Sequence, residues 1–158
     1  THAANGTAAT TLFGNIQFIE NAGESSTTAY DTITGFLKAD GTGVSDMLDF
    51  TNAVLTAYTA AAPTGYTAAQ LTVAVSAAGA VTFAGTSAAG LSVADKIAAI
   101  QSVVVTNNGD TAFFIDGGST YVFNNETAGD VVVQLVGQTG ATALITTNAV
   151  TANAIFIG

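Results

Sequence analysis

Apolar and polar residues alternate along most of this chain, in short runs separated by glycine and polar turns. Alternation with a period of two residues predicts half-buried β-strands rather than helices. The clearest example is 71–75, where Leu71, Val73 and Val75 share one face. The runs that predict strands are, in chain order, 11–19, 30–37, 71–75, 81–83, 112–115, 120–123, 131–136, 144–146 and 154–157.

Turn residues indicate how several of these strands connect. Asp116-Gly117-Gly118 lies between two apolar runs and predicts a tight β-hairpin, because glycine accepts the positive φ of such turns. Ala78-Gly79 predicts a second turn, between 71–75 and 81–83. The run 131–136 is nearly continuously apolar, which is typical of a strand buried on both faces.

Two segments carry helical spacing instead. In 52–61, Val54 and Tyr58 lie four positions apart, with Asp49 or Thr51 as the N-cap, and Pro63 and Gly65 follow as stop signals.

The second helix is expected to begin after Ser92. Ser92 and Asp95 form a weak capping box, and Ile97, Ile100 and Val104 follow at helical spacing.

Short strands with two short helices predict a mainly β fold, a β-sandwich or a β-roll-like stack. We expect a flexible N-terminal arm at 1–10 and a single β-rich structural domain over 11–158. The chain shows no fixed-period repeat, and the calcium-binding nonapeptide G-G-x-G-x-D is absent.

Composition narrows the range of functions. Hydrophobic residues make up 49% of the chain but charged residues only 8%, and the formal net charge is −9. This charge repels nucleic acid and anionic membranes and attracts cations, so no nucleic-acid partner is expected. The chain has no cysteine, which excludes disulfides and thiolate metal sites.

The same composition is typical of exported bacterial surface proteins. Residues 1–10 have neither the basic nor the apolar region of a signal peptide, and no apolar run is long enough to span a bilayer. We therefore expect an extracellular or cell-surface protein that is exported without an N-terminal signal peptide. A cell-surface polysaccharide is a candidate partner.

Catalysis has little support in the sequence. The single histidine, His2, lies in the predicted arm, and the chain contains no G-x-S-x-G, P-loop or G-x-G-x-x-G motif. A hydrolase with paired carboxylates is the weakest alternative, because the chain lacks the Trp and Arg residues that commonly hold sugars. We expect no enzyme and no catalytic residues.

Calcium is the cofactor that the aspartates favour, since it binds six to eight oxygens from carboxylates and turn carbonyls. Two groups of aspartates near glycine or asparagine are candidate ligands. The alternative is that these aspartates stabilise turns by bonding nearby backbone groups. The first group is Asp31, Asp40, Asp46 and Asp49; the second is Asp110, Asp116 and Asp130.

Self-assembly is a further hypothesis. The strands 131–136 and 154–157 contain no charged residue, and the chain has only two lysines to guard strand edges, Lys38 and Lys96. Unguarded edges favour a homo-oligomer or polymer joined through β-edge contacts. The alternative is that these strands are central and already paired.

Several segments together resemble the C-terminal region of type I secreted bacterial proteins of the S-layer and repeat-in-toxin (RTX) families. Asp31-Thr-Ile-Thr-Gly-Phe36 followed by Asp46-Met-Leu-Asp49-Phe50 is similar to the segment after their calcium-binding repeats. The tail 154–158 resembles an uncleaved secretion signal, and 105–158 as a whole is similar to a type I secretion segment. The other segments that share this resemblance are 81–85, 94–100, Phe113, 117–123 and 130–137.

This resemblance implies type I export, folding with calcium outside the cell, and Asp31, Asp46 and Asp49 as ligands. The leading hypothesis is an extracellular self-assembling structural protein, a calcium-stabilised S-layer or filament subunit. The alternative is the secretion-signal-bearing C-terminal domain of a larger RTX-type adhesin or enzyme.

Overall fold

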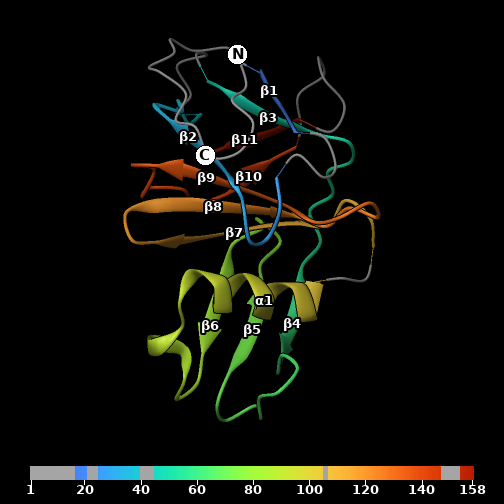
Figure 1. The fold of residues 1–158 in the computed structure, drawn as a ribbon, viewed down its shortest axis with the longest axis vertical. Helices are drawn as coiled ribbons and strands as arrows, with labels where there is room; N and C mark the ends of the chain where they lie inside the picture. Colours follow the sequence, from blue (N-terminus) through green and yellow to red (C-terminus); the bar gives the residue numbers. More distant parts are fainter. Residues whose placement is uncertain (1–16, 21–24, 40–44, 105–106, 147–153) are drawn as a thin grey trace.

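The computed structural model of the chain describes residues 17–20, 25–39, 45–104, 107–146 and 154–158. Among these residues the fold is mainly β and β-sandwich-like, which confirms the predicted fold class. Three sheets and one α-helix stack in layers along the long axis of the molecule (Figure 1). The predicted N-terminal arm at 1–10, His2 within it, and Asp40 lie outside the described residues.

The middle layer is a four-stranded sheet, here called the central sheet. Its order is β2 (Asp31–Thr34), β9 (Val131–Val136), β8 (Ser119–Asn124) and β7 (Thr111–Asp116). β2 runs parallel to β9, whereas β9, β8 and β7 are antiparallel neighbours. Gly117 and Gly118 join β7 to β8 with φ of 52° and 83°, which confirms the predicted hairpin.

A second four-stranded sheet packs on one face of the central sheet. Its order is β1 (Gln17–Glu20), β3 (Met47–Phe50), β11 (Ala154–Ile157) and β10 (Leu144–Ile145). β11 lies between β3 and β10 and is antiparallel to both. The last strand of the chain is therefore an interior strand, and this sheet and the central sheet together are called the sandwich below.

The other face of the central sheet is covered by α1 (Val93–Val104) and by an antiparallel sheet of β4 (Tyr58–Ala61), β5 (Thr72–Val75) and β6 (Val81–Ala84). A 3-10 turn, η1 (Ala88–Gly90), connects β6 to α1. This layer, residues 51–104, is called the α1 lobe below and forms the lower half of Figure 1. The predicted turn at Ala78-Gly79 joins β5 to β6.

Side-chain parity on the central sheet divides the core into two halves. Phe113 and Val133 belong to the cluster that faces the second four-stranded sheet, β1-β3-β11-β10, called the outer sheet below. Phe114 and Val132 belong to the cluster that faces the α1 lobe. Successive side chains of a strand point to opposite faces, so both faces of this sheet are buried. The structure thereby confirms the two-sided burial expected for 131–136.

The half of the core beneath the α1 lobe is rich in aromatic rings. Phe114 stacks on Tyr121 at 5.1 Å, and Phe83 of β6 and Tyr30 approach these two rings edge-on, at 5.8 and 5.6 Å. Burial, followed by the neighbouring Tyr30, raises the pKa of Tyr121 to about 12. The ring contacts connect β6 to the central sheet.

The prediction of a helix at 52–61 is wrong. Val54 forms an isolated parallel bridge with Asp110, and the segment continues into β4, which pairs with β5. Val54 N–H donates to Gly109 O at 2.7 Å and Val54 C=O accepts from Thr111 N–H at 2.8 Å. Tertiary hydrogen bonding at the edge of β7 therefore overrides a helical spacing that rested on two side chains.

The helix predicted after Ser92 is confirmed as α1. Ser92 Oγ accepts from Asp95 N–H at 3.2 Å, and the Asp95 carboxylate accepts from Ser92 N–H at 3.0 Å and from Ser92 Oγ–H at 2.6 Å. These reciprocal bonds are a capping box with Asp in place of the usual Glu. They satisfy N–H groups that have no partner inside the first turn.

Candidate functional site

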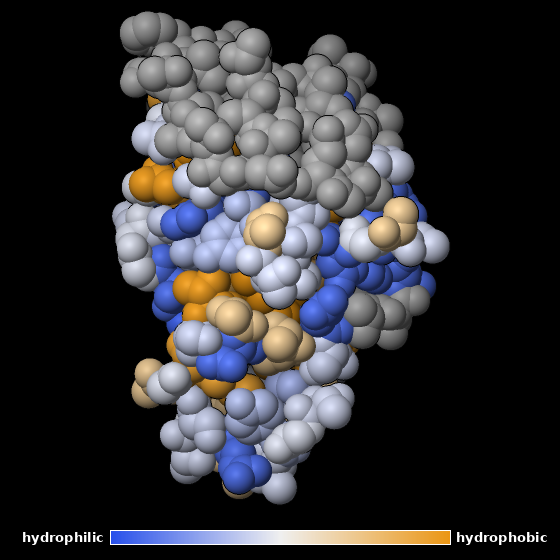
Figure 2. Space-filling view, in the orientation of Figure 1, coloured by the Kyte–Doolittle hydropathy of each residue, from blue (hydrophilic) through white to orange (hydrophobic). Residues whose placement is uncertain are grey.

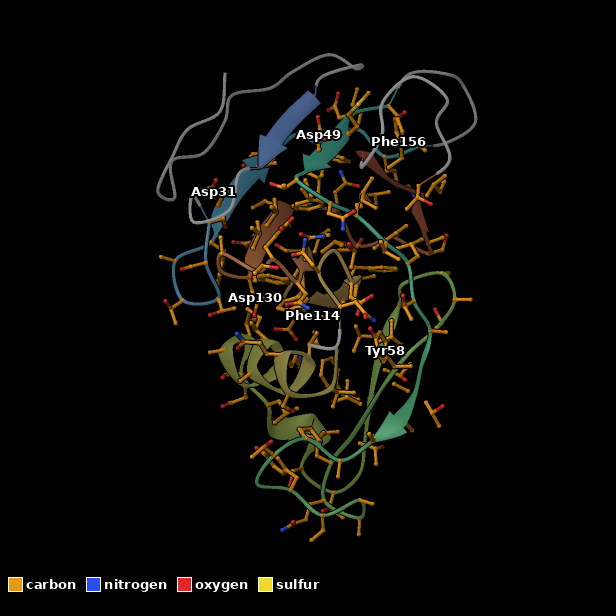
Figure 3. The ribbon with its side chains drawn as sticks, turned by 90° about the vertical axis from the view of Figure 1, so that its right-hand side faces the viewer. Asp31, Asp49, Tyr58, Phe114, Asp130 and Phe156 are labelled. Atoms are coloured by element: carbon orange, nitrogen blue, oxygen red, sulfur yellow. The ribbon has the colours of Figure 1, made fainter. Side chains whose placement is uncertain are left out.

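The first group of candidate ligands is divided between two sheets. Asp31 begins β2 of the central sheet and is 2% exposed, while Asp49 lies on β3 of the outer sheet and is half-buried. Figure 3 shows these two residues on separate strands at the same end of the molecule. Asp46 lies just before β3, and its carboxylate is fully buried. The described members of this group therefore share one end of the fold but come from different elements.

Asp46 forms two hydrogen bonds with the backbone of Leu37, nine residues before it. Its carboxylate accepts from Leu37 N–H at 2.9 Å, and its own N–H donates to Leu37 C=O at 2.8 Å. A buried carboxylate needs such donors to offset the loss of hydration. This geometry matches the turn-stabilising alternative for Asp46.

The second group of candidate ligands is separated by the length of a strand. Asp116 pairs with Ser119 at the hairpin end of the central sheet, whereas Asp110 and Asp130 precede β7 and β9 at the opposite end. A six-residue strand extends over roughly 17 Å between its first and last residues. Because calcium–oxygen distances are about 2.4 Å, Asp116 cannot share an ion with Asp110 or Asp130.

Each member of this second group is bound by protein donors. Asp116 pairs with Lys96, and Asp130 accepts from Gln101 Nε2 at 2.5 Å, so both tie the central sheet to α1. Figure 3 shows Asp130 directly above the helix. These contacts give Asp116 and Asp130 a cross-layer role that the sequence did not reveal.

Asp110 is fully buried and accepts hydrogen bonds from three residues. It accepts from Thr56 Oγ1 at 3.0 Å, from Asn107 N–H at 3.1 Å and Asn107 Nδ2 at 3.4 Å, and from the hydroxyl of Tyr58. The bonds to Thr56 and Tyr58 hold the segment that leads into β4 against the end of β7. Asp110 thus explains why 52–61 is extended.

A neighbouring amide network was missed by the sequence analysis. Asn124 Nδ2 donates to Asn52 O at 2.9 Å, to Thr111 Oγ1 at 2.8 Å and to Gly109 O at 3.3 Å. Asn52 N–H in turn donates to the buried Glu126 carboxylate at 3.1 Å. The repeated Asn residues at 107–108 and 124–125 were the available signal, since Asn favours turns.

Within the described part of the chain, no group of three or more His, Cys, Asp or Glu side chains comes together in a way that could hold a metal ion. The described segments likewise contain no helix with the length and apolar character needed to cross a membrane.

Charge is distributed unevenly between the two halves of the molecule. Asp95 and Lys96 are the only charged residues in the α1 lobe, so the lobe has no net charge and the remaining residues carry the net charge of −9. Lys96 is paired with Asp116, and Asp95 is bonded to Ser92. Figure 2 shows apolar surface over α1 and a surface of mostly intermediate hydropathy below it.

A shallow pocket of about 240 Å³ lies on the α1 lobe. Pro63, Tyr66, Asp95 and Ser102 are among its lining residues, and the Tyr66 side chain is 37% exposed. The carboxylate of Asp95 serves the helix cap, so this pocket presents no pair of groups arranged for acid–base chemistry.

No family model, no curated protein and no solved structure matches the chain.

Proposed function

We propose that the protein is an extracellular, non-catalytic structural subunit that assembles with copies of itself and is stabilised by calcium. The observation that carries this proposal is the division of the molecule into an acid-rich sandwich and a lobe without net charge. A net charge of −9 opposes association through the sandwich, because like charges repel. The α1 lobe is free of this repulsion.

The placement of both lysines supports self-association. Lysine on an edge strand is a common protection against edge-to-edge pairing. Here Lys38 Nζ donates to Gly140 O at 2.9 Å and Lys96 is paired with Asp116, so both are used within the molecule. The edge strands of the α1 lobe, β4 and β6, contain no charged residue.

Calcium enters this proposal through the acid-rich half. All the acidic residues of the chain except Asp95 lie outside the α1 lobe, and among the candidate ligands Asp49, Asp116 and Asp130 reach the surface of that half. Divalent cations collect at such a surface and reduce the repulsion between neighbouring subunits. We therefore expect calcium to promote assembly.

Electron microscopy of the purified protein tests this function, first in calcium and then after a chelator, at matched ionic strength. Ordered sheets or filaments that dissolve in chelator are the expected result. Assemblies that persist in chelator would retain the structural role and remove calcium from it. Dispersed monomers at high protein concentration in both solutions would overturn the proposal and favour the secretion-tail alternative.

A further inference from the structure

Among the described residues, one backbone edge of the outer strand β6 is left without a neighbouring strand over most of its length. In the order β4-β5-β6, it pairs with β5 alone, in regular register from Val75↔Val81 to Thr72↔Ala84. Ser76 N–H donates to Ala80 C=O at 2.9 Å. This bond fixes which residues of β6 direct their backbone N–H and C=O groups toward β5. The backbone groups of Thr82 and Ala84 therefore point to β5, and those of Val81 and Phe83 point away from it.

Only the beginning of this edge is covered by the rest of the molecule. Phe113 N–H of β7 donates to Gly79 C=O at 2.8 Å, and Ala80 and Phe113 form an isolated parallel bridge. Beyond that bridge β6 and β7 diverge, as Figure 1 shows. No described residue forms a hydrogen bond with the backbone N–H or C=O of Phe83.

The side chains of β6 suit strand pairing. Val81 and Phe83 are turned toward the core, where the Phe83 ring contacts Phe114, while Thr82 and Ala84 are exposed. The strand is uncharged and is rich in β-branched and aromatic residues, which favour the extended conformation. A regular edge with these properties is a template for another strand.

The other edge of the same sheet is less suitable. The pairing of β4 with β5 shifts register between Tyr58 and Ala61, where three steps along β4 match two along β5. Such a bulge twists an edge strand and interrupts the regular spacing of its outward groups. β6 has no register shift, so it is the edge that can pair without rearrangement.

We propose that β6 pairs antiparallel with β6 of a second copy of this chain, joining two three-stranded sheets into one of six strands. This inference rests on the proposed self-assembly and names its contact. Two identical strands that pair antiparallel are related by a two-fold axis, so the same surface serves both subunits. The two lobes in contact carry no net charge, and the antiparallel arrangement places the two acid-rich sandwiches at opposite ends of the joined sheet.

The charges also argue against other occupants of the edge. A basic partner would be drawn to the acid-rich sandwich, and an acidic partner would be repelled by it. A second copy offers an identical uncharged strand, whose outward backbone groups can pair with those of β6.

The decisive test compares two double variants by sedimentation velocity. Thr82→Lys with Ala84→Lys adds two charges to β6, and in the antiparallel register centred on Phe83 each new charge faces a like charge across the two-fold axis. Thr59→Lys with Ala60→Lys adds the same two charges to exposed positions on β4. We expect the association constant of the β6 variant to fall by roughly tenfold or more, while the β4 variant associates like wild type.

The outcomes separate this inference from the proposed function. If wild type and the β6 variant associate equally, the β6 contact is wrong and self-assembly stands. If wild type stays monomeric at every concentration, both are wrong. If both variants lose association, the effect is not specific to β6 and the contact is likewise overturned. Circular dichroism of each variant verifies that the sheets are intact.

Hydrogen exchange provides a second measurement that needs no substitution. The Phe83 amide points away from β5, so it should exchange rapidly in dilute monomer and slowly in the assembled protein. Equal exchange rates in the two states would overturn the β6 contact. The Thr82 amide, which points to β5, is the internal control and should be protected in both states.

Discussion

The sandwich and the α1 lobe use polar side chains in different ways. Polar side chains of the sandwich connect segments far apart in sequence, both within it, as in Gln138 with Phe36, and to the start of the lobe, as in Asp110 with Thr56 and Asn124 with Asn52. In the lobe, the bonded side chains are mostly close in sequence, as in Ser92 with Asp95 and Thr67 with Gln70. The sandwich therefore depends on specific long-range hydrogen bonds, and the lobe depends on apolar packing against the central sheet.

The largest expected effects come from truncating the core on each side of this division. Ile157 of β11 and Ile100 of α1 are both fully buried, one in each half of the core. Either change to alanine should cost about 2–5 kcal/mol of unfolding free energy, from lost burial and the remaining cavity. Urea unfolding measures this cost, and Ile115→Ala, at a 42% exposed position, is the matched control with an expected change of about 0.5 kcal/mol or less.

The shape of the urea unfolding transitions tests whether the sandwich and the α1 lobe unfold together. Because the central sheet contributes to both halves of the core, we expect one cooperative transition in both buried variants. Two transitions for Ile100→Ala, with the lobe unfolding first, would show that the two regions are separate cooperative units.

Asp110→Asn tests the long-range bonds by which the sandwich holds the start of the α1 lobe. Asparagine keeps the shape but replaces one acceptor oxygen by a donor, facing the donors from Thr56, Tyr58 and Asn107. We expect a loss of about 1–3 kcal/mol of unfolding free energy. Asp116→Asn is the control, because its pair with Lys96 is partly exposed and should contribute about 1 kcal/mol or less. Equal losses in the two variants would contradict the role assigned to burial.

Periodicity of side chains predicted the regular elements because their signal is local. The alternation at 71–75, the glycines at 117–118 and the cap at Ser92 all act within a few residues, and all match the structure. The strand β3 and the extended course of 52–61 were not predicted, since their partners β11 and Asp110 lie far along the chain. Short elements at edges are determined by such tertiary partners rather than by their own pattern.

The prediction of candidate ligands from the sequence was limited in the same way. Sequence spacing placed Asp110, Asp116 and Asp130 near turns, where the structure has them, but strand register decides which turns share an end of the sheet. That register depends on pairing between β7, β8 and β9, which spacing along the chain does not reveal. The uneven distribution of charge, in contrast, was present in the sequence and acquires meaning only when 51–104 becomes one layer.

The smallest expected effect concerns the one carboxylate of the α1 lobe. Hydrogen bonds from the Ser92 hydroxyl and then from the Ser92 backbone lower the pKa of Asp95 below its ordinary 3.8. A lowered folded-state pKa means that the cap contributes fully above the unfolded value and is lost as pH falls through the folded value. Acid should therefore loosen the first turn of α1 while leaving the sheets intact.

NMR titration of the Asp95 carboxyl measures this pKa directly. Ser92→Ala removes the hydroxyl bond and should return the pKa toward 3.8, with exchange of the first-turn amides increasing in the same variant. A pKa that is unchanged by Ser92→Ala would show that another group lowers it. It would also remove the clearest example of a carboxylate that acts only locally, on which the contrast between the lobe and the sandwich depends.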